Sequence, residues 1–179
     1  AAGMLMAWPL SAQTQNKKDI PADKVVEYKL VGEKVLNLHV YFPEDWKATD
    51  QRPGIVFFFG GGWSSGSPQQ FAFQADYFAS RGMVTACAEY RVKSRDGVTP
   101  DACVEDARSA VRWMRAHAAE LGLDPARLVA AGGSAGGHLA ATTAIPSSVE
   151  AEGDDLSIST IPCAMLLYNP VLDFSHPEL

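Results

Sequence analysis

The sequence predicts an α/β fold with a mostly parallel sheet and an antiparallel hairpin at its N-terminal side. From residue 53 onward, short apolar runs alternate with helical stretches over short connections, which is the pattern of right-handed βαβ units. Before residue 53, two strand-like runs flank Gly32-Glu33, as in an antiparallel pair. With 179 residues, 47% of them hydrophobic and 20% charged, the chain suits one globular domain with a sizeable core.

The hairpin is expected over residues 24–31 and 34–42. In its second run, Leu36, Leu38 and Val40 alternate with polar neighbours, which indicates one covered face. Residues 53–59 form a continuous apolar run, typical of a central strand covered on both faces. The remaining elements are predicted in the order helix 69–80, strand 83–88, helix 101–121, strand 127–131, helix 138–144 and strand 163–168.

The helix at 101–121 has the strongest pattern. Apolar residues repeat along one face at three- and four-residue intervals: Cys103, Ala107, Ala110, Met114, Ala118 and Leu121. Thr99 is its expected cap, with Pro100 at the first helical position and Gly122 at its end.

Residues 1–12 are uncharged and mostly apolar, and they give way abruptly to a polar stretch. This resembles the hydrophobic end of a secretory signal peptide with a cleavage site near Ala12. We therefore expect a signal remnant at 1–12, a linker at 13–23, a domain at 24–179, and an exported protein. The apolar stretch is too short to span a membrane; a disordered apolar tail is the alternative.

Charge and cysteine content narrow the possible partners. The formal net charge is -6 and no Lys/Arg-rich run exists, so nucleic acid is not an expected partner. Cys87, Cys103 and Cys163 lack metal-ligand spacing and lie in or beside apolar stretches, which predicts buried thiols. The acidic stretch 150–155 is expected to be a solvated connection and not a metal site.

The best indication of chemistry lies at residues 127–138. A short apolar run there ends in Gly132-Gly133-Ser134-Ala135-Gly136, which fits G-x-S-x-G, where the serine occupies a strained turn from strand to helix. Glycine is needed two residues before and after the serine because a Cβ would collide with neighbouring backbone. A flexible Gly-Ser loop is the alternative interpretation.

A second glycine-rich turn, Gly60-Gly61-Gly62, follows the third predicted strand. The carboxyl ends of parallel strands meet at one edge of the sheet, so the two turns are expected to lie together. A serine nucleophile needs a base, and its tetrahedral intermediate needs donors aimed at the oxyanion. Bare glycine N–H groups can approach a substrate without obstruction, so this turn is a candidate source of donors.

Four motifs occur in the order found in one known family. They are Phe-Phe-Phe-Gly-Gly-Gly-Trp at 57–63, Glu-Tyr-Arg at 89–91, Leu-Asp-Pro-Ala-Arg at 123–127 and Gly-Gly-Ser-Ala-Gly-Gly-His at 132–138. Together they resemble the hormone-sensitive-lipase-like branch of the α/β-hydrolases, especially bacterial esterases related to acetyl-xylan and feruloyl esterases. The resemblance covers about residues 24–175. It implies an α/β-hydrolase fold that stops after about the sixth strand, as in an N-terminal fragment.

By this resemblance Ser134 is the nucleophile, and the N–H groups of Gly61, Gly62 and Ala135 form the oxyanion hole. No metal or organic cofactor is implied. The chain departs from the family at two positions, because Phe59 stands where a histidine is usual and a glycine precedes the serine where Asp is frequent. Neither change removes a backbone donor, so both should affect loop order and specificity.

The triad acid and histidine are expected beyond Leu179, since in these folds they follow the nucleophile after later strands. The chain alone is therefore predicted to have little or no turnover. His138 should point toward helix packing or solvent. Asp173 and His176 stand in the right order, but the resemblance places them in the loop after the sixth strand.

Three other titratable residues are predicted to have no catalytic role. His39 and His117 should be surface residues. Asp106 is expected in a helix charge network with Arg108 and Arg112.

The predicted function is ester hydrolysis by a serine hydrolase through an acyl-enzyme, on acetyl or feruloyl esters of plant polysaccharide or similar small acyl esters. A prolyl-oligopeptidase-like peptidase and a non-catalytic binding module are alternatives. A nucleotide-binding protein is disfavoured, because neither glycine turn has the G-x-G-x-x-G or P-loop pattern.

Overall fold

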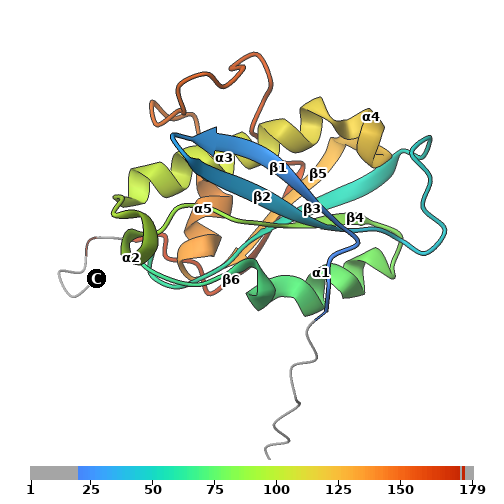
Figure 1. The fold of residues 1–179 in the computed structure, drawn as a ribbon, viewed down its shortest axis with the longest axis horizontal. Coiled ribbons are helices and arrows are strands. Elements are labelled where there is room, and N and C mark those ends of the chain that lie inside the picture. The colour runs from blue at the N-terminus through green and yellow to red at the C-terminus, as the bar shows by residue number, and fades with distance from the viewer. Residues whose placement is uncertain (1–19, 174, 176–179) are drawn as a thin grey trace, which may run out of the picture.

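The structure, a computed structural model, describes residues 20–173 and 175. The predicted signal remnant at 1–12, the first part of the predicted linker and His176 lie outside the described residues. The fold is a six-stranded sheet in the order β1-β2-β4-β3-β5-β6 with helices on both sides (Figure 1). The predicted α/β architecture is thus confirmed.

The N-terminal hairpin consists of β1 (Lys24–Val31) and β2 (Lys34–Tyr41), which pair antiparallel. β2 also pairs antiparallel with β4 (Val84–Ala88), so β1 is the edge strand. Leu36, Leu38 and Val40 are completely buried, as their alternation predicts.

The other strand pairs are parallel. β3 (Arg52–Phe58) lies between β4 and β5 (Leu123–Gly133), and β6 (Ala164–Tyr168) pairs with β5. Phe58, the last residue of β3, pairs with Gly132 near the end of β5. This register brings both glycine-rich turns to the same edge of the sheet.

Helices cover the two faces of this sheet (Figure 1). A 3-10 helix, η1 (Pro68–Phe71), leads into α1 (Ala72–Ala79), which packs on β4. On the opposite face, α3 (Pro100–Ala116) packs against α5 (Ala135–Thr143). Right-handed crossovers require opposite faces, because the chain moves across the sheet in opposite directions after β3 and after β4.

The predicted helix at 101–121 is interrupted. α3 ends at Ala116, and the short helix α4 (Ala118–Leu121) follows, because His117 leaves the helical region with φ -102° and ψ 20°. Its apolar face is nevertheless as predicted: Cys103, Ala107, Ala110, Met114, Ala118 and Leu121 are all buried.

Two further differences from the predicted secondary structure were found. The helix expected to start near His138 begins at Ala135, since Ser134 alone makes the turn and no glycine loop intervenes. The short helix α2 (Lys93–Asp96) was not predicted.

Cys87 and Cys103 are buried as expected, but Cys163, which was also predicted to be buried, is exposed. It directly precedes β6, the strand at the other edge of the described sheet, where the side chains are only partly covered.

Candidate active site

Ser134 forms the junction between β5 and α5. Its backbone has φ 53° and ψ -120°, a strained conformation for a residue with a side chain. A Cβ on Gly132 would lie 2.2 Å from the carbonyl oxygen of Gly136, and a Cβ on Gly136 would lie 2.1 Å from that of Phe58. Real Cβ atoms never approach backbone so closely, so the prediction that both positions require glycine is confirmed. The turn is a tightly packed elbow and not a flexible loop, and it leaves Ser134 exposed.

The second glycine turn follows β3 and also has positive φ angles. Gly61, Gly62 and Trp63 have φ angles of 140°, 60° and 57°. A Cβ on Gly61 would lie 2.1 Å from the carbonyl oxygen of Ser65, so only glycine fits there. Gly61 and Gly62 are both exposed, which leaves their backbone open to a bound molecule.

The two turns are in contact. A Cβ on Gly60 would lie 2.8 Å from the Gly133 carbonyl oxygen and 3.3 Å from the Ser134 Cβ. Ala135 is the first residue of α5, so its N–H has no acceptor within the helix and lies at the positive end of the helix dipole. The structure therefore gathers the four predicted site residues at one edge of the sheet, where backbone donors could meet a developing oxyanion.

Phe59, at the position where the resemblance implies a histidine, is tied down by other contacts. Its ring stacks on Tyr90 with centroids 4.0 Å apart, and its carbonyl oxygen accepts a 2.6 Å hydrogen bond from the Tyr90 hydroxyl. On the other side, the Gly60 N–H donates to Oε1 of Gln70 at 2.5 Å. The loop is thus ordered without a histidine. Sequence reasoning missed Tyr90 and Gln70, although the Glu-Tyr-Arg motif marked the first of them.

His138 lies beside this loop on α5. Its Nδ1 accepts a hydrogen bond of 3.3 Å from the Trp63 indole N–H, and the two rings meet edge to face. Burial lowers the pKa of His138, which favours the neutral imidazole that this bond requires. As predicted, the side chain is engaged in packing. Among the described residues, no imidazole is hydrogen bonded to the Ser134 hydroxyl.

The other candidate residues lie elsewhere. Asp173 is exposed and accepts a hydrogen bond from the Ser175 N–H. His39 and His117 were predicted to be surface residues, but both are half-buried. His39 contacts Glu89 at 3.0 Å, and His117 stacks on Trp113 with centroids 4.0 Å apart.

The charge network predicted around Asp106 is wrong in its partners. Asp106 is completely buried and pairs with Lys29 at 2.7 Å and Arg91 at 2.8 Å. Helical spacing predicts Arg108 and Arg112 as partners, but Asp106 lies on the side of α3 that faces β1 and the segment directly after β4. Contacts across the fold decide such pairs, and local spacing does not report them.

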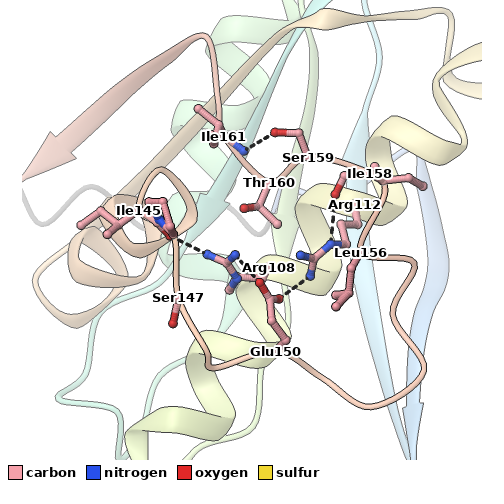
Figure 2. A pocket seen from close by; sticks show the side chains of 11 residues that line it. Arg108, Arg112, Ile145, Ser147, Glu150, Leu156, Ile158, Ser159, Thr160 and Ile161 are labelled. Atoms are coloured by element: carbon pink, nitrogen blue, oxygen red, sulfur yellow. Dashed lines mark hydrogen bonds and ion pairs between the residues drawn. The ribbon is translucent and has the colours of Figure 1, made fainter.

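Arg108 and Arg112 instead bind the connection between α5 and β6, so the acidic stretch 150–155 is not a merely solvated connection. Glu150 bridges both guanidinium groups, and the hydrogen bond from Arg108 is the main reason why its pKa falls to about 2. A cavity of about 290 Å³ opens beside this cluster (Figure 2). Its lining includes no residue of either glycine turn, so it is separate from the candidate active site.

Within residues 20–173 and 175, no three His, Cys, Asp or Glu side chains gather as a bound metal ion would require. Over the same residues, no helix combines the length and apolar character needed to cross a membrane.

A serine in strained backbone at the end of a central parallel strand, next to a donor-bearing turn on the adjacent strand, is the nucleophile-elbow arrangement of the α/β-hydrolase fold. The BD-FAE family model matches residues 38–175. The chain belongs to this family.

Known relatives agree with this assignment. The chain is 30% identical over 149 residues to the carboxylesterase NlhH of Mycobacterium tuberculosis, covering 80% of this chain and 45% of that protein. It is 30% identical over 122 residues to a probable isoprenylcysteine alpha-carbonyl methylesterase, ICMEL1, of Arabidopsis thaliana, covering 68% of this chain and 25% of that protein. The chain therefore spans less than half the length of either relative.

Solved structures of an esterase are also similar. Thermogutta terrifontis esterase 2 phosphorylated by paraoxon has 54% sequence identity and a TM-score of 0.85, covering 89% of this chain and 62% of that one. The propionate-bound form of the same esterase has the same sequence identity and TM-score, and the match covers 58% of that esterase chain. These neighbours are esterases, and this chain matches a little over half of each.

Proposed function

We propose that this chain carries the nucleophile and the oxyanion hole of a serine carboxylesterase. The observation that carries the proposal is the strained backbone of Ser134, held by close packing of glycine backbone and placed against the Gly60 turn. Esterase 2 from Thermogutta terrifontis is phosphorylated by paraoxon, and such covalent modification is the behaviour of an activated nucleophile.

In this mechanism the Ser134 Oγ attacks the ester carbonyl carbon while a histidine takes the hydroxyl proton. The N–H groups of Gly61, Gly62 and Ala135 stabilise the negative oxygen of the tetrahedral intermediate. The carbon–oxygen bond to the alcohol then breaks, and the alcohol leaves with the proton from the histidine. Water hydrolyses the acyl-enzyme by the same steps. We place the histidine and its acid in the part of the protein that follows Leu179.

The proposed substrates are esters of small acyl groups, including acetyl or feruloyl esters on plant polysaccharide. Propionate-bound and butyrate-bound forms of esterase 2 are known, which supports a site for short acyl groups. The family and the carboxylesterase relative point to the same reaction. We also propose that the protein is exported, on the basis of the apolar, uncharged residues 1–12.

The test uses the full-length protein with p-nitrophenyl acetate and a fluorophosphonate probe. We expect the Ser134→Ala variant to lose turnover by about 10⁴-fold or more and to lose labelling by the probe. Ser80→Ala, at the end of α1, is the matched control and should behave like the unmodified protein. Turnover that survives Ser134→Ala would contradict the proposal. Labelling of Ser134 together with cleavage of peptide anilides but not esters would favour the peptidase alternative.

A further inference from the structure

The segment that follows β4 is hydrogen bonded to the loop after β3 along its length. Residues 90–95 contact residues 59–66 at four points: the Tyr90 hydroxyl to the Phe59 carbonyl at 2.6 Å, the Lys93 N–H to the Trp63 carbonyl at 2.9 Å, the Ser94 N–H to the Ser64 carbonyl at 3.0 Å, and the Arg95 Nη1 to the Gly66 carbonyl at 2.7 Å. Gly61 and Gly62 lie between the first two of these points. Their position therefore depends on the segment after β4.

The Tyr90 hydroxyl binds the loop after β3 at the point where this loop packs against α5. A Cβ placed on Gly136 would lie 2.4 Å from the Phe59 carbonyl oxygen. This oxygen is therefore packed against the first turn of α5 while it accepts the Tyr90 hydroxyl. The hydroxyl thus helps set the spacing between the loop that bears Gly61 and Gly62 and the helix that bears Ala135.

Tyr90 is itself held rigidly. It is 1% exposed and stacks on Phe59. The next residue, Arg91, contacts the buried Asp106 through its backbone N–H and its guanidinium group. The preceding residue, Glu89, accepts hydrogen bonds from the backbone and side chain of Asn37 on β2. Burial raises the pKa of Tyr90 well above its ordinary value, so the hydroxyl stays a donor at physiological pH.

We propose that Tyr90 is a positioning residue for the oxyanion hole: by holding the Phe59 carbonyl, it sets the distance between the Gly61 and Gly62 donors and Ala135. This inference rests on the proposed esterase function. Tyr90 acts through Phe59 and does not touch the substrate. Its contribution should appear in the transition state, where the oxyanion forms, and hardly at all in the binding of the ester.

A second tyrosine provides a matched control. Tyr28 on β1 is 8% exposed, and its hydroxyl donates a 2.6 Å hydrogen bond to the carbonyl oxygen of Glu89. Tyr28→Phe and Tyr90→Phe thus remove the same kind of hydrogen bond from similarly buried sites. The acceptor of the first bond, Glu89, directly precedes Tyr90, the donor of the second. Only the second bond reaches the loop after β3.

The experiment compares both variants in the full-length protein with p-nitrophenyl acetate and a trifluoromethyl ketone, which forms a tetrahedral adduct with an active serine. We expect Tyr90→Phe to lower kcat by about tenfold to a hundredfold, less than the loss from removing an oxyanion donor outright, with KM changed less than about twofold. The inhibition constant of the ketone should rise by the same factor. Tyr28→Phe should keep kcat within about twofold of the unmodified protein while losing about as much thermal stability as Tyr90→Phe.

Other results would overturn the inference. An unchanged kcat in Tyr90→Phe, or an equal loss in Tyr28→Phe, would show that Tyr90 has only a structural role. If Tyr90→Phe does not fold, Arg95→Ala tests the same set of hydrogen bonds at an exposed position; we expect a two- to fivefold lower kcat there, in line with loss of a single hydrogen bond, and no change would refute the inference. If Ser134→Ala retains turnover, the proposed function itself fails, whatever the tyrosine variants do.

Discussion

The two glycine-rich turns meet at one sheet edge but are fixed by different means. The elbow around Ser134 is fixed by backbone packed on backbone, because Gly132 and Gly136 leave no room for even one carbon atom. The turn at Gly60–Gly66, the outer turn, also has close backbone contacts at Gly61 and Gly66, but it is held in addition from outside, by side chains such as Tyr90 and Gln70. The elbow should therefore respond to mutation by losing the fold. The outer turn should respond by losing activity while the fold remains.

The largest effect is expected at the elbow. In Gly136→Ala the new Cβ would meet the Phe58 and Phe59 carbonyl oxygens at 2.1 and 2.4 Å. Both belong to the end of a central strand and its continuation and cannot move aside. We expect a loss of about 3 kcal/mol or more in the free energy of unfolding, or no folded protein, measured by urea denaturation. Gly153→Ala is the control: nothing lies within 4 Å of its Cβ, so only the strain of its positive φ of 88° remains, which costs about 1 kcal/mol; a loss there equal to that of Gly136→Ala would remove the proposed distinction.

The next effect separates neighbouring glycines in the outer turn. Gly61→Ala would place a Cβ 2.1 Å from the Ser65 carbonyl, whereas Gly62→Ala meets nothing within 4 Å. Both have positive φ: the 60° of Gly62 costs an alanine about 1 kcal/mol, whereas the 140° of Gly61 lies outside the left-handed helical region and costs an alanine more. We expect Gly61→Ala to lower kcat by about a hundredfold or more, and Gly62→Ala to lower it much less. In both variants the melting temperature should fall by only a few degrees. Equal activity losses would show that strain, and not the clash, matters.

This difference explains what the sequence could predict. The elbow was predictable because its glycines are required by local collisions, and G-x-S-x-G records such collisions directly. The meeting of the two turns at one edge was predictable too, since alternating elements with short connections imply a parallel sheet. The six-residue apolar face of the helix after residue 99 was correct for the same reason: periodicity is local.

Side-chain partners across the fold could not be predicted. Asp106 finds Lys29 and Arg91 across 77 and 15 residues of sequence, and Tyr90 finds Phe59 across 31. No spacing rule encodes such pairs. The helix start at Ala135 was missed because glycines suggest a loop, whereas Gly136 and Gly137 here lie inside the first helical turn, where Phe58 and Pro170 pack against them.

A third region, the connection between α5 and β6, should differ from both turns in how its contribution to stability depends on pH. Neither turn contains a carboxylate, whereas Glu150 pairs with Arg108 and Arg112 in the connection before β6. Its pKa falls from 4.5 to about 2, chiefly through the Arg108 hydrogen bond. A pKa that is lower in the folded state gives stability that is complete above the unfolded value and is lost as the pH falls through the folded value.

We therefore expect Glu150→Gln to lose about 2 kcal/mol in the free energy of unfolding at pH 7. The difference from the unmodified protein should shrink as the pH falls from about 5 toward 2. Urea denaturation across this pH range measures it, with Glu152→Gln, two residues away and exposed, as the control. A difference that stays constant with pH would exclude the charge as its source.

The smallest effect is expected from the other contact that holds the outer turn. Gln70→Met removes the acceptor of the Gly60 N–H, which is bound at 2.5 Å, while keeping a side chain of similar length. A neutral hydrogen bond of this kind contributes about 1 kcal/mol. We expect kcat to fall by about threefold to tenfold and KM to change little, with Gln69→Met in the same 3-10 helix as the control. Gly60 adjoins both Gly61 and the elbow at Gly133. A loss of stability without a loss of kcat would therefore show that the Gln70 contact supports the elbow. The two turns would then form one rigid unit.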